Sequence, residues 1–531
     1  MENIMTIINY ALYGLVALLA LIGMLFGLRR GLVRQSFRLI TVIAALLVAF
    51  LVTTSLYPKL MESFEGKTVN EIASQYGASI PENISAWLDC FDTDTVAYAA
   101  SLPVTVVALP FVFLVAFAAT SIVFYILFVI LAGVLGFLRR NRSAVSRLTG
   151  ALIGIVQGAL VAGVILLPAA GIATLAGDAI STVEEKHPDS KNAATLGDMY
   201  DQYVEPVASN PVIKISEGTL GFMYDAMAKV EIEGDVVEMS GVVTDAIELF
   251  TLYGDLEGAD FKNLSEEHKA TVDSMITIFN GDHYMTELLS GIMRAVAKAE
   301  SNGTLTLNVE DEVTHNFLVS FIHVFDGSTS QTVTEDLRTT ENIYFLLSDS
   351  GTLLAFGDNS DGMALVNALA KIDENGKSTL GSICTELKNN VRTAPIATEL
   401  NNLAMKALLT SVGISDPNVQ ERVEEVKSDL NEVIAMDRED YETEEEYKGA
   451  VSDKISDTLA KNEIEITDEQ LSQVSDFVIE EFEDVDEISD AEIADFMAKY
   501  YDVYLNASSS GELPDELPDE LPDDIPEGIF S

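Results

Sequence analysis

The sequence predicts an all-α protein: a four-helix transmembrane bundle, followed by a large acidic, mostly helical soluble domain and a disordered tail. Three observations lead to this prediction. Four apolar stretches long enough to cross a bilayer lie within the first 176 of the 531 residues. Apolar residues at three- and four-residue spacing continue through most of the remaining chain. The last stretch, 507–531, contains a repeated Glu-Leu-Pro-Asp, and its prolines and charges together disfavour a helix there.

The four spans are predicted at about residues 7–28, 39–57, 111–136 and 148–175. A longer apolar region leads into the third span, and Pro103 and Pro110 are expected to bend it. No Asp, Glu, Lys, Arg or His falls inside the predicted bilayer core of any span. Because ion pumps and proton-coupled carriers usually need such groups at depth, their absence argues against a transporter of that kind.

The arginines decide the predicted topology. All eight in residues 1–176 lie in the two short loops that join spans one and two and spans three and four: Arg29, Arg30, Arg34, Arg38, Arg139, Arg140, Arg142 and Arg147. Short loops rich in Lys and Arg stay in the cytoplasm. The N-terminus, the loop 58–100 and everything after residue 176 are therefore predicted to lie outside a cytoplasmic (inner) membrane. Setting this orientation and attracting anionic headgroups would be enough to explain the arginines.

The charge distribution agrees with this topology. Residues 1–176 hold ten Lys and Arg against eight Asp and Glu, whereas the whole chain has a net charge of −53. The excess of acid therefore lies entirely beyond residue 176. A strongly acidic surface argues against nucleic acid and against anionic lipid headgroups as partners of this part of the chain. It permits basic partners or loosely held divalent cations, and solubility at the cell surface is the simplest interpretation.

Two rows of glycine predict close helix contacts. The glycines recur at four-residue spacing, three at the end of the first span and three at the start of the fourth: Gly23, Gly27, Gly31, Gly150, Gly154 and Gly158. Such a row is a smooth stripe against which another helix packs closely, within the chain or in a second copy, so a homo-oligomer stays open. Gln157 is the one strongly polar side chain deep in the fourth span. An interhelical hydrogen bond is the first interpretation of Gln157, and a role in a pore or binding site is the alternative.

The fourth span resembles the corresponding helix of the colicin V production protein (CvpA) family, whose pattern is Arg-x-x-Gly-x-x-x-Gly-x-x-basic-Gly. Arg147 and the three glycines that follow match it, whereas Gln157 replaces the basic residue. Ser146 stands where an acidic residue often precedes the arginine. Residues 27–35 resemble the family's Gly-x-x-Arg-Gly-x-x-Arg turn, although the usual Asp near the start of the first helix is missing. The resemblance covers residues 1–175. It implies a multi-pass membrane protein linked to production or export of a peptide toxin and to envelope function.

The rest of the chain is assigned by helix patterns and breaks. The predicted parts are a linker at 177–194, a helical extracytoplasmic domain at 195–415, an acidic helical subdomain at 416–506 and the disordered tail at 507–531. One of the helix patterns covers residues 236–253. Asp416–Pro417 is typical of a helix start, and three pairs are typical of capping boxes: Thr443 with Glu446, Thr467 with Gln470, and Ser489 with Glu492.

Motifs for catalysis, cofactors or metals are missing. The sequence has no phosphate-binding glycine loop, no zinc-protease motif and no hydrolase nucleophile elbow, and its five histidines are scattered. Cys90 and Cys384 cannot form a C-x-x-C motif and are interpreted as two unrelated thiols rather than a disulfide. No cofactor or metal and no enzymatic activity are predicted.

Three hypotheses for the function follow. The first is a non-enzymatic membrane protein of the colicin V production type whose acidic ectodomain binds an extracytoplasmic protein partner. The second is a channel or carrier through the bundle, in which Gln157 would affect the flux. The third is a surface scaffold or adhesin for which the bundle is only an anchor in the lipid bilayer.

Overall fold

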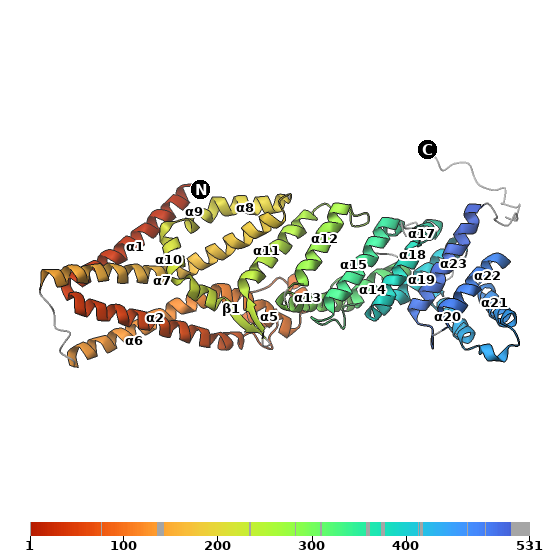
Figure 1. Cartoon of the computed structure of the whole chain (residues 1–531), viewed down its shortest axis with the longest axis horizontal. Coiled ribbons are helices and arrows are strands. Elements are labelled where there is room, and N and C mark those ends of the chain that lie inside the picture. Colours follow the sequence, from red (N-terminus) through yellow and green to blue (C-terminus); the bar gives the residue numbers. More distant parts are fainter. Residues whose placement is uncertain are drawn as a thin grey trace. The chain divides into compact units, whose positions relative to one another are not determined.

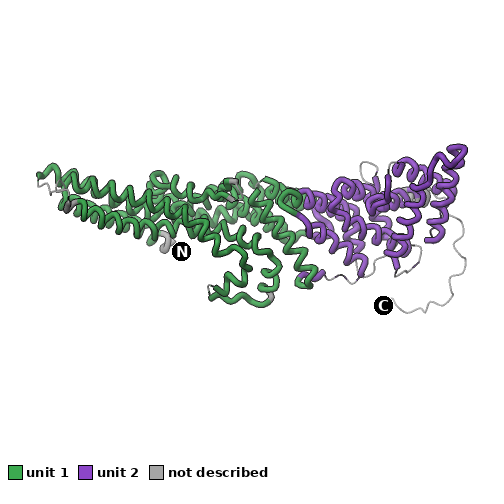
Figure 2. The backbone as a smooth tube through the Cα atoms, turned by 90° about the horizontal axis from the view of Figure 1, so that it is seen from below, with its two compact units in different colours: residues 1–259, 266–304, 329–334 green, residues 260–265, 305–328, 335–531 purple. Residues whose placement is uncertain are grey.

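The predicted fold class is confirmed. A computed structural model describes residues 2–510 except 76, 135–142, 233–234, 282, 308, 310, 357–361, 373–376, 412–413, 415–417, 463, 465 and 484. The described chain is almost entirely helical, and four of its helical stretches are long and apolar enough to cross a membrane. These stretches are Thr6–Arg30, Leu32–Met61, Thr93–Leu131 and Ala144–Lys186. The chain divides into two compact units, of which the first contains all four stretches (Figure 2).

The long helices of the first unit are α1 (Glu2–Arg30), α2 (Leu32–Met61), α6 (Leu109–Val134) and α7 (Ala144–Lys186). Between α2 and α6 lie α3 (Val69–Gln75), α4 (Glu82–Leu88), α5 (Thr93–Pro103) and a π-helical segment (Val104–Ala108). The second span therefore begins at Leu32, seven residues before the predicted start at 39. The difference arises because the arginine-rich turn is helical and only Gly31 interrupts it.

The four long helices form two neighbouring pairs, α1 with α7 and α2 with α6 (Figure 1). The end of α1, the start of α2, the end of α6 and the start of α7 all lie at one end of this bundle, at the left of Figure 1. We call it the arginine end, because Arg29, Arg30, Arg34, Arg38 and Arg147 are at it. The bundle thus brings together two basic segments that are more than a hundred residues apart in the chain.

The prolines before α6 coincide with a change of helix type. Residues 104–108 form the π-helical segment, directly after Pro103 and directly before α6. In a regular α-helix, the donor to the carbonyl of Val106 would be residue 110, which is proline and has no N–H. The hydroxyl of Tyr224 donates a hydrogen bond to this carbonyl instead, at 3.1 Å. Burial raises the pKa of Tyr224, so this phenol remains a proton donor.

Tyr224 belongs to a layer of helices that covers α7. This layer consists of α8 (Lys191–Tyr203), α9 (Glu205–Ala208), α10 (Pro211–Met227) and α11 (Met239–Asp255). Ser216 of α10 donates a hydrogen bond to the carbonyl of Gly163, at 2.8 Å. The ring of Tyr224 lies against Gly171, where a β-carbon would overlap it. Small residues on α7 therefore let α10 pack directly on a helix of the bundle.

A short hairpin precedes α11. Strands β1 (Lys229–Ile232) and β2 (Asp235–Glu238) pair antiparallel, with Val230 opposite Val237. The helix predicted for 236–253 is therefore correct only from Met239 onward. Residues 236–238 are held in the strand because their backbone pairs with β1 and Val237 is buried. The unit is completed by α12 (Glu266–Phe279) and α13 (His283–Ser301), and Arg294 of α13 pairs with Asp92 at 3.0 Å.

The second unit contains the remaining helices. They are α14 (Glu312–His323), most of α15 (Val333–Ser350), α16 (Thr352–Ala355), α17 (Gly362–Leu369), α18 (Thr379–Asn389), α19 (Ala394–Ser411), α20 (Val419–Ile434), α21 (Glu444–Lys461), α22 (Asp468–Glu481) and α23 (Asp490–Ser510), with short 3₁₀ turns at Val391–Thr393 and Arg438–Asp440. Helix α19 is central and contacts α14, α17, α20 and α23. Asp336 is fully buried in this unit, where Ser328, Asn390 and Arg392 all donate to its carboxylate.

The observed parts differ from the predicted boundaries. Of the predicted linker 177–194, residues 177–186 continue α7 and residues 191–194 begin α8. Ala179 and Val183 are buried and keep this part of α7 packed, so polar composition alone was misleading. The predicted subdomain 416–506 shares its unit with earlier helices, since α23 packs on α18 and α19.

The helix starts agree with the sequence where the structure describes them. Thr467 and Gln470 form the predicted capping box, and Thr443 accepts a hydrogen bond from the backbone N–H of Glu446. The backbone N–H of Ser489 donates to Glu492 at 2.9 Å, directly before α23. Asp416–Pro417 and tail residues 511–531 lie outside the described residues, whereas 507–510 are the end of α23.

Replacing Tyr224 with Phe tests the bond to Val106. The substitution keeps the ring and leaves a buried carbonyl without its donor, which should lower the free energy of unfolding by about 1–2 kcal/mol. Thermal unfolding of the purified full chain in detergent measures the change. Tyr253→Phe is the matched control, because Tyr253 is 70 % exposed. Equal effects of the two substitutions would contradict this role of Tyr224.

Candidate functional site

The glycine rows meet each other within one chain. Gly23 lies against Gly154, and Gly27 lies against Gly150, so α1 and α7 run antiparallel with their backbones in contact. A β-carbon added at Gly27 would lie 2.8 Å from the Cα of Ala151, and one at Gly150 would lie 2.7 Å from the carbonyl oxygen of Gly27. Both distances are too short for a real side chain, so only glycine fits.

The remaining two glycines extend this contact in different ways. Gly158 lies against the backbone of Leu19 and Ala20 rather than against another glycine. Gly31 forms the turn between α1 and α2, with a φ of 78° that favours glycine. It also lies beside Gly150, where an added β-carbon would be 2.9 Å from the Cα of Gly31. All six predicted glycines thus lie along the α1–α7 contact, and the partner of each row is the other row of the same chain.

Ser146 ties the start of α7 to the start of α2. The backbone N–H of Leu32 donates a hydrogen bond to the hydroxyl of Ser146, at 3.0 Å. This N–H belongs to the first turn of α2, where backbone N–H groups have no acceptor within their own helix. Ser146 therefore supplies from another helix the acceptor that a capping residue usually supplies locally.

Gln157 is buried and makes the interhelical hydrogen bond that was its first interpretation. The side-chain amide of Gln35, on α2, donates to the side-chain oxygen of Gln157, on α7, at 2.7 Å. Both side chains are buried, Gln35 almost completely. Gln35 was not identified from the sequence, because the second span was predicted to begin at residue 39. A polar residue four positions after Gly31 in a continuing helix would have been the signal for it.

Arg30 and Arg38 lie against aromatic rings. The guanidinium of Arg30 is 4.7 Å from the ring centre of Phe26, and that of Arg38 is 5.6 Å from the same ring and 5.2 Å from that of Tyr125. Arg38 thereby links α1, α2 and α6 through cation–π contacts. Arg29 is exposed. Arg139, Arg140 and Arg142 lie outside the described residues.

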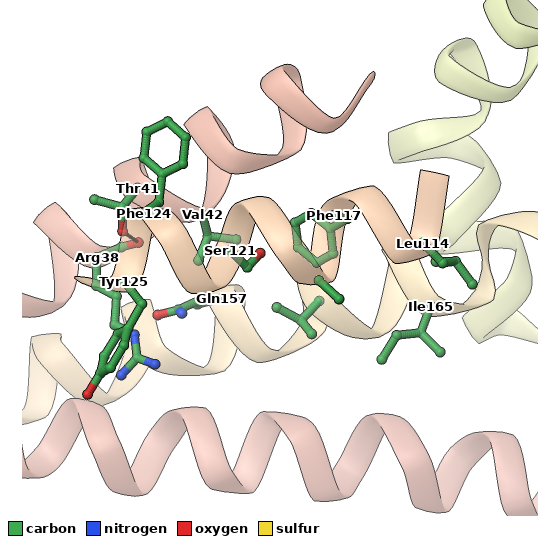
Figure 3. A pocket seen from close by; sticks show the side chains of 12 residues that line it. Arg38, Thr41, Val42, Leu114, Phe117, Ser121, Phe124, Tyr125, Gln157 and Ile165 are labelled. Carbon is green, nitrogen blue, oxygen red and sulfur yellow. Dashed lines mark hydrogen bonds between the residues drawn. The ribbon is translucent and has the colours of Figure 1, made fainter. Parts of the chain in front are cut away.

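A cavity of about 380 Å³ lies between α2, α6 and α7, next to the buried glutamine pair (Figure 3). Arg38, Tyr125 and Gln157 line one end of it, and Leu114 and Ile165 line the other. The middle is lined by further apolar side chains and by Ser121. The cavity is therefore amphipathic, with its charged end near the arginine end of the bundle.

A larger and more acidic cavity, of about 970 Å³, lies where α2 and α5 meet the hairpin, away from the arginine end. Its charged lining residues are Glu62, Glu65, Asp94, Glu231 and Lys229. Lys229 is paired with Glu238, so the carboxylates dominate the charge of this cavity. Nearby, burial would raise the pKa of Asp92, but hydrogen bonds from Thr95 and Arg294 and the charge of Arg294 hold it below its ordinary value.

Within the described part of the chain, no group of three or more His, Cys, Asp and Glu side chains is placed to hold a metal ion. Cys90 and Cys384 are both buried and belong to different units.

The bundle combines four apolar helices, an arginine end and two glycine rows that pack against each other. These features agree with the family resemblance seen in the sequence, and a comparison with family models tests that resemblance. Residues 14–183 match the model for the colicin V production protein. This part of the chain belongs to the colicin V production family. The chain is therefore a multi-pass membrane protein whose first third carries the domain of that family, and no enzymatic family is indicated. Searches of curated proteins and of solved structures gave no match.

Replacing Gly27 with Ala tests the helix contact of the colicin V production domain. The added methyl group would press on the backbone of Gly150 and Ala151, so α1 and α7 must separate. Overpacking of this kind should cost about 1–3 kcal/mol of stability. Unfolding in detergent, followed by circular dichroism, measures the loss. Gly14→Ala is the control on the same helix, because no atom lies within 4 Å of a β-carbon there. A loss equal to that of Gly14→Ala would contradict the proposed contact.

Proposed function

We propose that this chain is a non-enzymatic membrane protein that supports production or export of a peptide toxin and envelope function, and that its acidic part binds an extracytoplasmic partner. The single observation that carries the proposal is the continuity of α7. This helix has 43 residues, or a length of about 64 Å at 1.5 Å per residue, and a bilayer core is about 30 Å thick. One continuous helix, with Pro168 inside it, therefore belongs both to the glycine-packed bundle and to the part that lies beyond it.

The contacts of α10 support the same proposal. Ser216 and Tyr224 fix α10 to α7 and to Val106, and these bonds lie outside the glycine contact with α1. Glu248 of α11 also pairs with both Lys186 and His187, at 2.6 and 2.8 Å, where α7 ends. A binding event on this layer would act directly on a helix of the bundle, which an anchor alone would not need.

The chemistry of the partner is proposed from charge. The arginine end faces the cytoplasm in this proposal, because short loops rich in Arg remain there. The acidic cavity and the acidic helices then lie on the extracytoplasmic side. Their excess of carboxylates favours a partner with a basic surface or a basic peptide segment.

Orientation is tested by labelling single cysteines in spheroplasts with a membrane-impermeant thiol reagent. Cys90 and Cys384 are replaced with Ser, and one cysteine is placed at Ser472, an exposed position of α22. A matched variant carries its cysteine at Asn141, between the third and fourth spans. Ser472→Cys should be labelled in intact spheroplasts and Asn141→Cys only after lysis. The reverse pattern would place the acidic part in the cytoplasm and reject an extracytoplasmic partner.

The role itself is tested in a strain that lacks this chain. The strain should show a changed profile of secreted peptides and greater permeability to a dye that the intact envelope excludes. Both changes should be reversed by the full chain supplied from a plasmid. An unchanged secretome together with an intact permeability barrier would reject the proposed function.

A further inference from the structure

The described arginines at the arginine end of the bundle have no carboxylate partners among the described residues. The chain contains no Asp or Glu between residues 3 and 61 or between 95 and 177, the stretches that form α1, most of α2, α6 and most of α7. Among the described residues, no ion pair involves Arg30, Arg34 or Arg38. The stretches that form the bundle therefore supply no negative charge to balance these arginines.

Arg38 differs from its neighbours because it lines the cavity between α2, α6 and α7. One terminal nitrogen of its guanidinium is buried and makes no hydrogen bond to any described residue. Two other buried polar atoms also make no hydrogen bond to any described residue. One is the hydroxyl of Ser121, which lines the cavity, and the other is the side-chain oxygen of Gln35, whose amide donates to the lining residue Gln157. Leaving buried polar groups without hydrogen bonds is costly, so these atoms indicate a polar ligand group at this end of the cavity.

The rest of the lining has the opposite character. From Tyr125 back to Leu114, the cavity follows about 16 Å of α6, at 1.5 Å per residue. Along this length Phe117, Val161 and Ile165 present apolar surface. A ligand that fits both ends carries an anionic group at Arg38 and a hydrocarbon chain along α6.

We propose that this cavity binds an anionic phospholipid of the surrounding leaflet, with the phosphate on Arg38 and one acyl chain toward Leu114 and Ile165. Arginine binds phosphate through paired, charge-assisted hydrogen bonds, and Ser121 is placed to add a further donor. The volume of 380 Å³ accommodates a headgroup and part of one chain, and the remainder of the lipid stays in the bilayer. This proposal does not depend on the proposed function or on the orientation of the bundle.

The shape of the site favours a lipid over a soluble anion. A soluble phosphate would need only the polar end, whereas most of the lining side chains are apolar. The charged end also lies six residues into α2, at the level where a headgroup meets the hydrocarbon of the bilayer. An anionic lipid reaches this position by lateral diffusion and brings its own chain.

The test measures how much radiolabelled phosphatidylglycerol the purified full chain retains in neutral detergent, compared with phosphatidylcholine that has the same acyl chains. The wild-type chain should retain phosphatidylglycerol about tenfold better, because the choline cation of phosphatidylcholine offsets the charge of the phosphate that binds Arg38. Arg38→Gln should remove this preference. Arg29→Gln is the matched control, because it removes the same charge from an exposed position at the same end of the bundle.

A second pair of variants tests whether the lipid occupies the cavity, without changing any charge. Ser121→Leu fills the cavity and should lower retention of phosphatidylglycerol even though Arg38 is present. Ser55→Leu is its control, because Ser55 is exposed on α2 and does not line the cavity. Each variant is compared only after it elutes as the same single species as the wild type.

Three outcomes would overturn the proposal. The first is equal retention of the two lipids by the wild-type chain. The second is an equal loss in Arg38→Gln and Arg29→Gln, which would show general attraction to the arginine end. The third is displacement of phosphatidylglycerol by millimolar inorganic phosphate, which would assign the polar end to a soluble anion. Loss confined to Arg38→Gln and Ser121→Leu supports the lipid site.

Discussion

The structure depends first on the backbone contact between α1 and α7. Association of helices in lipid gains little from the hydrophobic effect, because lipid chains are as apolar as the helix surfaces. Dispersion contacts and short-range backbone contacts must supply the stability instead. The glycines at 23, 27, 150 and 154 have no β-carbon, so at these positions each helix packs on the main chain of the other. This close contact between α1 and α7 also sets the positions of Gly31, Ser146 and the arginines.

Once α1 and α7 are fixed, the polar groups of the bundle find partners across helices. The hydroxyl of Ser146 accepts a hydrogen bond from the first turn of α2, Gln35 donates to Gln157, and Tyr224 donates to the carbonyl of Val106. Each of these bonds replaces one that water would supply in a soluble protein. The bundle is therefore specific in register as well as tightly packed, since a shift by one residue would break all three bonds.

Much of the bundle could be predicted from the sequence. Glycines at four-residue spacing and clustered arginines are local signals. The structure places the glycines along the α1–α7 contact and the described arginines at one end of the bundle. The partners of single polar side chains could not be predicted in the same way. Nothing near Gln157 in the sequence points to Gln35, and nothing near Pro110 points to Tyr224, more than a hundred residues later. The hairpin at 229–238 was missed because its alternating residues also fit the start of the helix that follows.

The continuity of α7 also fixes the angle between the face that packs on α1 and the face that packs on α10. One face of this helix carries Gly150 and Gly154 against α1, and a later face carries Gly163 and Gly171 against α10. Because an α-helix turns about 100° per residue, inserting a single residue between Gly158 and Gly163 would rotate one face by that amount relative to the other. An insertion of seven residues would nearly restore the angle. The length of this segment is therefore constrained in steps of two helical turns, although no residue within it needs a particular side chain for that purpose.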